Sequence, residues 1–224
     1  MHDVTLVFDL DGTLVDTAPD LIRAANHVLA TEGLPAIAGK ELRPAISFGA
    51  RQMLATGLRI HGISRSEAEI DALLDRFLAF YADNIAVESR PFPGMIEALE
   101  QCRAEGAVLA VCTNKREHLS RRLLGELGLA PLFRAVAGRD TFAVCKPHPD
   151  HLFGAIRLAD GDPRRAVMIG DSDTDVQTAK AARIPIIGVT FGYTDVPVAK
   201  LGADAVIDHY HEFQPALVRL LAQF

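Results

Sequence analysis

Residues 7–16 read VFDLDGTLVD and place two aspartates, Asp9 and Asp11, at the end of an apolar run. If residues 4–8 form a β-strand, alternate side chains point to the same face, so both carboxylates lie on one side of the chain. Carboxylates that close repel each other and resist joint ionisation. The stretch therefore predicts a buried strand whose carboxyl end needs a source of positive charge.

Further apolar runs of strand length follow this one. They are rich in Val, Ile or Ala and show no alternation, which is typical of strands buried on both faces of a parallel sheet. The runs are residues 107–112, 134–138, 166–170, 185–189 and 204–208. Helical patterns lie between them, at residues 94–105, 117–127, 150–158, 174–182 and 211–223. This alternation predicts an α/β fold with a doubly wound, Rossmann-like parallel sheet.

Residues 17–88 interrupt the alternation. They contain no strand-like run, and their apolar residues recur at helical spacing. The strand–helix pattern resumes after the turn signal RPFPG at residues 90–94. We therefore expect an α/β catalytic core formed by residues 1–16 and 89–224, with an inserted all-helical cap domain at residues 17–88.

Length and composition exclude several classes of protein. The 224 residues are enough for a core with an inserted lobe, and the formal charge of −6 argues against a nucleic-acid or membrane-surface partner. No apolar run approaches the roughly 18 residues of a membrane-spanning helix, and VTLVF is too short for a signal peptide. The three cysteines fit reduced thiols better than a disulfide framework. We expect a cytoplasmic monomer or homodimer.

Polar residues follow two of the expected strands. Thr113 and Asn114 come after residues 107–112, and GDSDTD occupies residues 170–175. Lys146 lies between these segments in a stiff loop, CKPHP. Because the carboxyl ends of parallel strands share one edge of the sheet, where ligands bind, we expect these groups to converge with the two aspartates of the first strand.

This set of side chains suits phosphoryl transfer. Several carboxylates form a hard-oxygen site for Mg²⁺, which offsets their repulsion. A magnesium ion, a lysine and hydroxyl or amide donors are what the oxygens of a transferring phosphoryl group require. One aspartate can attack phosphorus, and a second can protonate the leaving oxygen and later deprotonate water. The expected partner is a small phosphorylated substrate.

The same residues resemble the signature motifs of a known family. DLDGT at 9–13, the Thr113-Asn114 pair, Lys146 and GDSDTD at 170–175 are similar, in order and spacing, to the four motifs of the haloacid dehalogenase-like phosphatases. Within that family, KPHP after Cys145 and FGY at 191–193 resemble the bacterial phosphoglycolate phosphatases. The resemblance covers essentially the whole chain, including the helical cap.

The resemblance implies roles for individual residues. Asp9 would be the nucleophile and Asp11 the general acid/base. Mg²⁺ would be held by Asp9, the backbone carbonyl of Asp11 and Asp171, with Asp175 in support. The residues that would hold the phosphoryl oxygens are Gly12, through a free amide, together with Thr113, Asn114 and Lys146. The implied reaction is hydrolysis of 2-phosphoglycolate to glycolate and phosphate through an aspartyl-phosphate.

Other functions stay open at this point. A β-phosphoglucomutase-like phosphosugar isomerase would share the nucleophile and the cap, and a phosphatase or pyrophosphatase for another small phosphate would share the whole site. Dehalogenase relatives lack the second aspartate that Asp11 supplies here. A phospho-receiver domain is about half this length and has no helical insert.

The roles of two basic residues are less clearly indicated by the motifs. Arg51 follows Gly49 in the expected cap, and either contacts a substrate carboxylate or is solvated or salt-bridged. Lys115 is expected to face solvent.

Several further side chains are assigned structural roles. Two histidine pairs, His148 with His151 and His209 with His211, lack further ligands at zinc-site spacing. Cys112 is expected to be a core residue.

Overall fold

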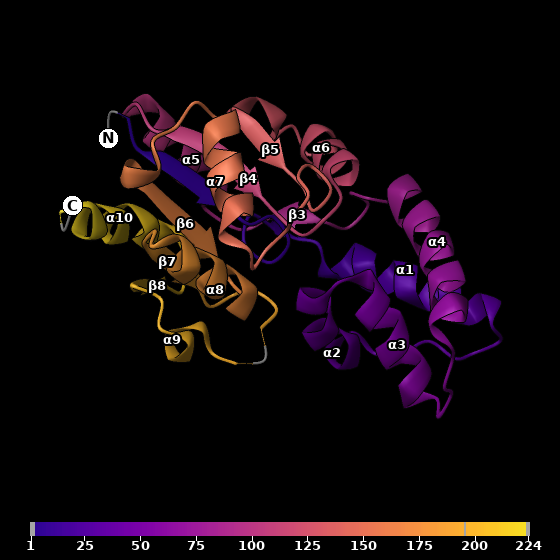
Figure 1. Cartoon of the computed structure of the whole chain (residues 1–224). Helices are drawn as coiled ribbons and strands as arrows, with labels where there is room; N and C mark the ends of the chain where they lie inside the picture. The colour runs from indigo at the N-terminus through magenta and orange to yellow at the C-terminus, as the bar shows by residue number, and fades with distance from the viewer. Residues whose placement is uncertain (1–2, 195, 223–224) are drawn as a thin grey trace. The chain divides into compact units, whose positions relative to one another are not determined.

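The computed structural model describes residues 3–194 and 196–222. The chain divides into two compact units. We call the first the core; it comprises the chain up to Asp16 and from Pro91 onward. We call the second the cap; it runs from Thr17 to Arg90. Figure 1 shows the helices of the cap and the sheet and helices of the core.

Six parallel strands form the sheet of the core, in the order β5-β4-β1-β6-β7-β8. The strands are β1 (Thr5–Phe8), β4 (Val108–Cys112), β5 (Ala135–Ala137), β6 (Ala166–Gly170), β7 (Ile186–Val189) and β8 (Ala205–Ile207). Each lies within one of the six predicted runs, so the doubly wound α/β fold is confirmed. The chain order diverges on the two sides of β1, and the neighbouring ends of β1, β4 and β6 are therefore where ligands are expected.

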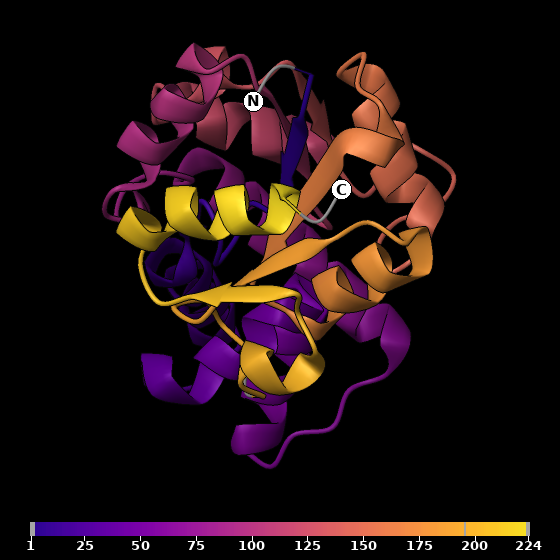
Figure 2. The ribbon, with the colours of Figure 1, turned by 90° about the vertical axis from the view of Figure 1, so that its left-hand side faces the viewer.

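Both faces of this sheet are buried, which explains the lack of alternation in its strands. Val7 belongs to a core cluster that includes Leu152 and Val176, whereas the ring of the next residue, Phe8, lies 5.9 Å from the ring of Phe213. Figure 2 shows the sheet with helices on its two sides. The helices of the core are α5 (Met95–Ala104), α6 (Glu117–Glu126), α7 (Pro149–Leu158), α8 (Asp173–Ala182), α9 (Val198–Leu201) and α10 (Phe213–Leu221).

Between residues 17 and 88 the cap consists of helices joined by turns and loops, and it contains no strand there. Its helices are α1 (Ala18–Thr31), α2 (Gly39–Leu42), α3 (Ala50–Ile60) and α4 (Glu67–Asp83), with a 3₁₀ helix at Arg43–Phe48. Helices α1, α3 and α4 pack on one another around apolar side chains such as Leu54 and Phe77. Ser66 begins α4 with a capping box, in which its hydroxyl and Glu69 satisfy each other's backbone N–H groups.

Asp20 is a buried carboxylate that ties together the two ends of the cap sequence. It accepts hydrogen bonds from the backbone N–H groups of Glu88 and Ser89, at 3.0 Å and 2.8 Å, and from the hydroxyl of Ser89 at 2.7 Å. Arg23 lies 2.9 Å away and balances the charge. The beginning of α1 is thereby fixed to the segment after α4.

Two short strands and one short α-helix were not expected. A two-stranded sheet pairs β2 (Val15–Asp16) with β3 (Arg90–Pro91), and α9 is a helix of four residues. Elements this short leave no periodic signal in a sequence. Among the described residues, no helix has both the length and the hydrophobicity that crossing a membrane would require.

Candidate active site

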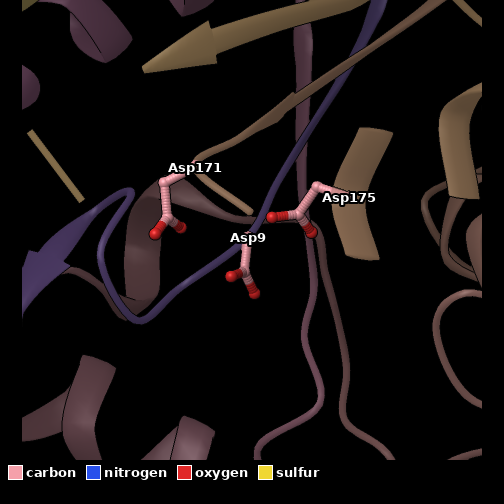
Figure 3. A group of neighbouring side chains, drawn as sticks. All are labelled: Asp9, Asp171 and Asp175. Carbon is pink, nitrogen blue, oxygen red and sulfur yellow. The ribbon is translucent and has the colours of Figure 1, made fainter. Parts of the chain in front are cut away.

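Three buried carboxylates, those of Asp9, Asp171 and Asp175, meet at the carboxyl ends of β1 and β6 (Figure 3). One oxygen of each lies within 4.8 Å of one oxygen of each of the others. The strands cause this meeting, because Phe8 pairs with Ile169 and the N–H of Asp9 donates to the carbonyl of Ile169 at 2.9 Å. Asp175 arrives from the first turn of α8.

Lys146 brings a positive charge into this cluster. Its ammonium lies 2.6 Å from Oδ1 of Asp175 and 2.9 Å from Oδ1 of Asp9, and only 2% of its side chain is exposed. Burial alone acts to lower the pKa of Lys146, but the attraction of Asp175 and Asp9 outweighs it and raises the pKa. Lys146 therefore stays charged.

One lysine does not neutralise three buried acids. Burial raises the pKa of Asp9 to about 6, although the charge of Lys146 opposes this shift. The pKa of Asp171 is raised to about 8 by burial and by the charges of Asp175 and Asp9. Both shifts mean that the negative form is short of positive partners. A divalent cation would supply them.

The donor set fits such a cation. Oδ1 of Asp9 is buried and accepts no hydrogen bond from the described residues, although it forms the ion pair with Lys146. Carboxylate oxygens are the ligands that Mg²⁺ prefers. Asp175 is more committed, because Oδ1 accepts from Lys146 and Oδ2 from the N–H and hydroxyl of Ser172. Asp171 accepts one hydrogen bond on each oxygen, fewer than Asp175, so Asp9 and Asp171 are the best placed ligands, with Asp175 beside them.

Neighbouring groups fix Asp171. Its Oδ1 accepts a hydrogen bond from the hydroxyl of Thr13 at 3.0 Å, and its Oδ2 accepts one from the N–H of Tyr193 at 2.9 Å. Gly12 has φ +84°, and a Cβ there would lie 2.7 Å from Oδ2 of Asp171. Only glycine fits this position, both for its backbone conformation and for its space.

The structure corrects one expectation at Gly12. Its N–H was expected to be available to a phosphoryl oxygen, but it donates to the carbonyl of Val15 at 3.0 Å. The tight turn after β1 uses this donor to close on itself. Gly12 therefore contributes shape to the site, by letting the turn approach Asp171.

Asp11 lies outside the carboxylate cluster and has a cation of its own. The ammonium of Lys115 is 2.8 Å from Oδ1 and 3.0 Å from Oδ2 of Asp11. The expectation that Lys115 faces solvent is wrong, since only 6% of its side chain is exposed. Sequence reasoning missed this contact because the two residues follow different strands, β1 and β4, and only the fold brings them together.

Thr113 and Asn114 both lie at the end of β4, but their side chains are engaged in different ways. Thr113 is buried, and its hydroxyl oxygen accepts from the N–H of Lys115 at 3.2 Å. Asn114 is exposed and donates its amide to the carbonyl of Lys146 at 3.0 Å. Asn114 therefore holds the loop that carries Lys146, a contact that its sequence neighbours do not reveal.

The side chain of His151 also contacts the loop that carries Lys146. It is fully buried; its Nδ1 accepts from the N–H of Lys146 at 3.1 Å, and its Nε2 lies 3.0 Å from the carbonyl of Gly138. Accepting an N–H at Nδ1 requires the neutral ring with its proton on Nε2. Burial lowers the pKa of His151 to about 4, which agrees with that tautomer.

Arg51 is ion-paired within the cap. Its Nη2 lies 2.7 Å from Oε2 of Glu67 and 3.0 Å from Oδ1 of Asp71, and Gly49, with φ +87°, begins the helix that carries it. The structure thus shows the salt-bridged alternative. All of these contacts use one nitrogen of the guanidinium.

The remaining sulfur and imidazole groups have structural contacts. Cys112 is buried at the end of β4, and burial raises the pKa of its thiol to about 12, so it is a protonated core residue as expected. His148 accepts the N–H of Asp150 at the start of α7. In the described ranges the acidic cluster is the one group with metal-ligand spacing, and it includes no histidine.

Known proteins are similar in sequence to this chain over most of its length. A model of the family described as Haloacid dehalogenase-like hydrolase matches residues 6–189. A protein of Mesorhizobium japonicum named phosphoglycolate phosphatase is 50% identical over 205 residues, which cover 92% of this chain and 90% of that protein. One of the same name from Caulobacter vibrioides is 44% identical over 224 residues, covering 99% and 94%.

Two more relatives extend the comparison. An N-acetylmuramic acid 6-phosphate phosphatase of Pseudomonas aeruginosa is 35% identical over 219 residues, which cover 96% of this chain and 95% of that protein. The crystal structure of a predicted phosphoglycolate phosphatase from Haemophilus somnus superposes with a TM-score of 0.87 at 28% identity, covering 96% of this chain and 97% of that one.

Proposed function

Because the chain belongs to the haloacid dehalogenase-like hydrolase family, we propose that it is a Mg²⁺-dependent phosphatase that hydrolyses a small phosphate monoester through an aspartyl-phosphate on Asp9. The observation that carries this proposal is the meeting of Asp9 with Asp171 and Lys146 at the end of the sheet. Nucleophile, metal ligand and phosphate-binding cation then lie within one buried cluster.

The first step forms a bond between a carboxylate oxygen of Asp9 and phosphorus. The bond from phosphorus to the ester oxygen breaks, and Asp11 gives its proton to the departing oxygen. In the second step a water oxygen bonds to phosphorus while Asp11 takes its proton. The bond to Asp9 then breaks, which releases inorganic phosphate and regenerates both carboxyl groups.

The other residues of the site would place positive charge beside the phosphoryl oxygens or orient the groups that do so. Lys146 places one ammonium beside the attacking oxygen, where the phosphoryl group brings negative charge. Asp9 and Asp171, supported by Asp175, would hold Mg²⁺, which when bound supplies positive charge to the phosphoryl oxygens. Thr13 and Tyr193 hold the carboxylate of Asp171, which would be one of the ligands of that ion, in a fixed orientation.

For the substrate we propose 2-phosphoglycolate. The support is the name shared by relatives that are 44–50% identical over most of this chain. We also keep Arg51 as the proposed cap residue for the substrate carboxylate. Its contacts with Glu67 and Asp71 use Nη2, which both two-point edges of a guanidinium include, so a substrate carboxylate would take over or share these contacts.

A sugar phosphate is the second candidate, because an N-acetylmuramic acid 6-phosphate phosphatase is 35% identical over 96% of this chain. A sugar phosphate could also be the substrate of a mutase reaction, in which the same nucleophile returns the phosphoryl group to a sugar hydroxyl instead of to water. The two outcomes differ in product. Hydrolysis releases inorganic phosphate, whereas isomerisation conserves the sugar phosphate.

The deciding experiment is a panel of small phosphate esters assayed for released phosphate with Mg²⁺ and again with EDTA. The panel contains 2-phosphoglycolate, several sugar phosphates, pyrophosphate and a nucleotide. We expect the highest kcat/KM for 2-phosphoglycolate and no release in EDTA. A clear preference for another ester would overturn the substrate, and undiminished release in EDTA would overturn the metal-dependent mechanism.

We propose the cytoplasm as the compartment. All three cysteines, Cys102, Cys112 and Cys145, are free thiols in the structure, as expected where thiols are kept reduced.

A further inference from the structure

The ion pair between Lys115 and Asp11 is unusual for a lysine. Both carboxylate oxygens of Asp11 accept from the ammonium, at 2.8 Å and 3.0 Å, and the lysine side chain is 6% exposed. Lysine is rarely buried to this extent unless it is paired, because its charge is costly to remove from water. The position of Lys115 is therefore specified by its partner.

The backbone of Lys115 is held on both sides. Its N–H donates to the hydroxyl of Thr113 at 3.2 Å, and its carbonyl accepts the N–H of Arg139 at 2.9 Å. Gly138 packs against this carbonyl so closely that a Cβ would lie 2.8 Å from it. The side chain thus starts from a backbone that is held on both sides, and its ammonium is held at the other end by the pair with Asp11.

Asp11 is the group that this anchor orients. It lies two positions after Asp9 and outside the cluster formed by Asp9, Asp171 and Asp175. A contact with both of its oxygens fixes the plane of the carboxyl group as well as its direction. Proton transfer is sensitive to such orientation, since the donor must lie within hydrogen-bond distance of the reacting oxygen.

We propose that Lys115 is a positioning residue that holds the Asp11 carboxyl group in place for both proton transfers. The inference rests on the proposed function, in which Asp11 serves the departing ester oxygen and then the attacking water. Lys115 acts through Asp11 and does not contact the phosphoryl group. Its loss is expected to affect the reaction only where Asp11 is needed.

The test compares two leaving groups. The parameter kcat/KM reports the steps up to departure of the leaving group. In these steps the glycolate oxygen of 2-phosphoglycolate needs a proton from Asp11, whereas the p-nitrophenolate of p-nitrophenyl phosphate leaves without one. We expect Lys115→Met to lower kcat/KM for 2-phosphoglycolate by about tenfold or more and for p-nitrophenyl phosphate by less than about threefold. Lys115→Arg keeps a charged two-point donor and is expected to restore most of the loss. Lys200→Met, on the exposed α9, is the control and should match the wild type.

A double-mutant cycle with Asp11→Asn locates the effect. If Lys115 acts through Asp11, Lys115→Met adds little to the loss already caused by Asp11→Asn. Additive losses, or equal losses for both esters, would overturn the positioning role. Circular dichroism checks folding, and Lys115→Gln replaces the Met variant if that one does not fold. A wild type without phosphatase activity would overturn the proposed function and this role with it, whereas an active wild type with uniform losses would overturn this role alone.

Discussion

Lys146 places its ammonium 2.9 Å from Oδ1 of Asp9, the oxygen that accepts no hydrogen bond from the described residues. The pair leaves that oxygen beside one positive charge, and no backbone N–H or hydroxyl group of the described residues donates to it. A nucleophile needs this combination, because a carboxylate that donors surround is a weaker attacking group. The pKa of Asp9, raised by burial to about 6, also indicates a carboxylate more basic than one in water.

Magnesium should stabilise the folded protein as well as activate it. Asp9 and Asp171 repel each other, and a cation between them removes that cost. At a Mg²⁺ concentration of about 100 times its dissociation constant, the free energy of unfolding should rise by about 2.7 kcal/mol. Thermal denaturation with Mg²⁺ and then EDTA measures this gain. Asp171→Asn should lose most of it, while Asp173→Asn, on the exposed side of α8, should keep it. An equal gain in both variants would contradict the metal site.

His151 should make the protein less stable as the pH falls. Burial lowers its pKa from 6.5 to about 4 in the folded state, so between these values the unfolded chain binds a proton that the folded protein does not. Its contribution is complete above the unfolded pKa and is lost as the pH falls toward the folded one, by about 3 kcal/mol in all.

The measurement for His151 is urea denaturation at several pH values. His151→Gln removes the titrating ring, so its stability should fall less than that of the wild type between about pH 7 and about pH 4. His118→Gln, on the exposed surface of α6, should follow the wild type. Identical pH slopes for the wild type and His151→Gln would show that His151 does not titrate as stated.

The fold and the centre of the site could be predicted because their signals are local. Each buried strand is a continuous apolar run, and the carboxyl ends of adjacent strands share one edge of the sheet. Asp9 and Asp171 therefore had to meet once β1 and β6 were neighbours. The acidic motif GDSDTD predicted Asp175 in the same way, because the first turn of α8 directly follows β6.

Contacts between distant side chains could not be predicted in this way. Lys115 contacts Asp11 because the turn after β1 brings the Asp11 carboxylate next to the end of β4. Asn114 contacts the carbonyl of Lys146 because the loop that carries Lys146 folds back onto the same end of β4. The donor of Gly12 was misassigned because a tight turn can either present an N–H or use it internally, and the sequence is the same in both cases. Burial of His151 depends on the packing of α7 against the sheet.

Replacing Asp20 should loosen the ends of the cap sequence. Asp20→Ala leaves the buried N–H and hydroxyl of Ser89 without their acceptor and Arg23 without its ion-pair partner, at a cost of about 2–4 kcal/mol. Hydrogen exchange followed by mass spectrometry should show faster exchange at residues 86–92. Asp75→Ala, at an exposed position of α4, is the control. Unchanged protection in Asp20→Ala would mean that the carboxylate does not hold this segment.

Arg51 should affect one class of ester. Arg51→Ala is expected to reduce kcat/KM more for 2-phosphoglycolate than for a phosphate ester whose leaving group is uncharged. The difference in activation free energy should be about 1–3 kcal/mol, because only 2-phosphoglycolate carries a carboxylate for the guanidinium. Arg65→Ala, which removes another ion-paired arginine of the cap, controls for lost cap stability. Equal losses for both esters would make the ion pairs with Glu67 and Asp71 the whole role of Arg51.

The central claim is that Asp9 carries the phosphoryl group during turnover. Asp11→Asn should slow attack by water, so that the phospho-enzyme accumulates when p-nitrophenyl phosphate and Mg²⁺ are added. Rapid acid quenching followed by peptide mass mapping should then find one phosphoryl group on Asp9, removable by hydroxylamine, and none in Asp9→Asn. A phosphoryl group on another residue, or an active enzyme that never carries one on Asp9, would contradict the account.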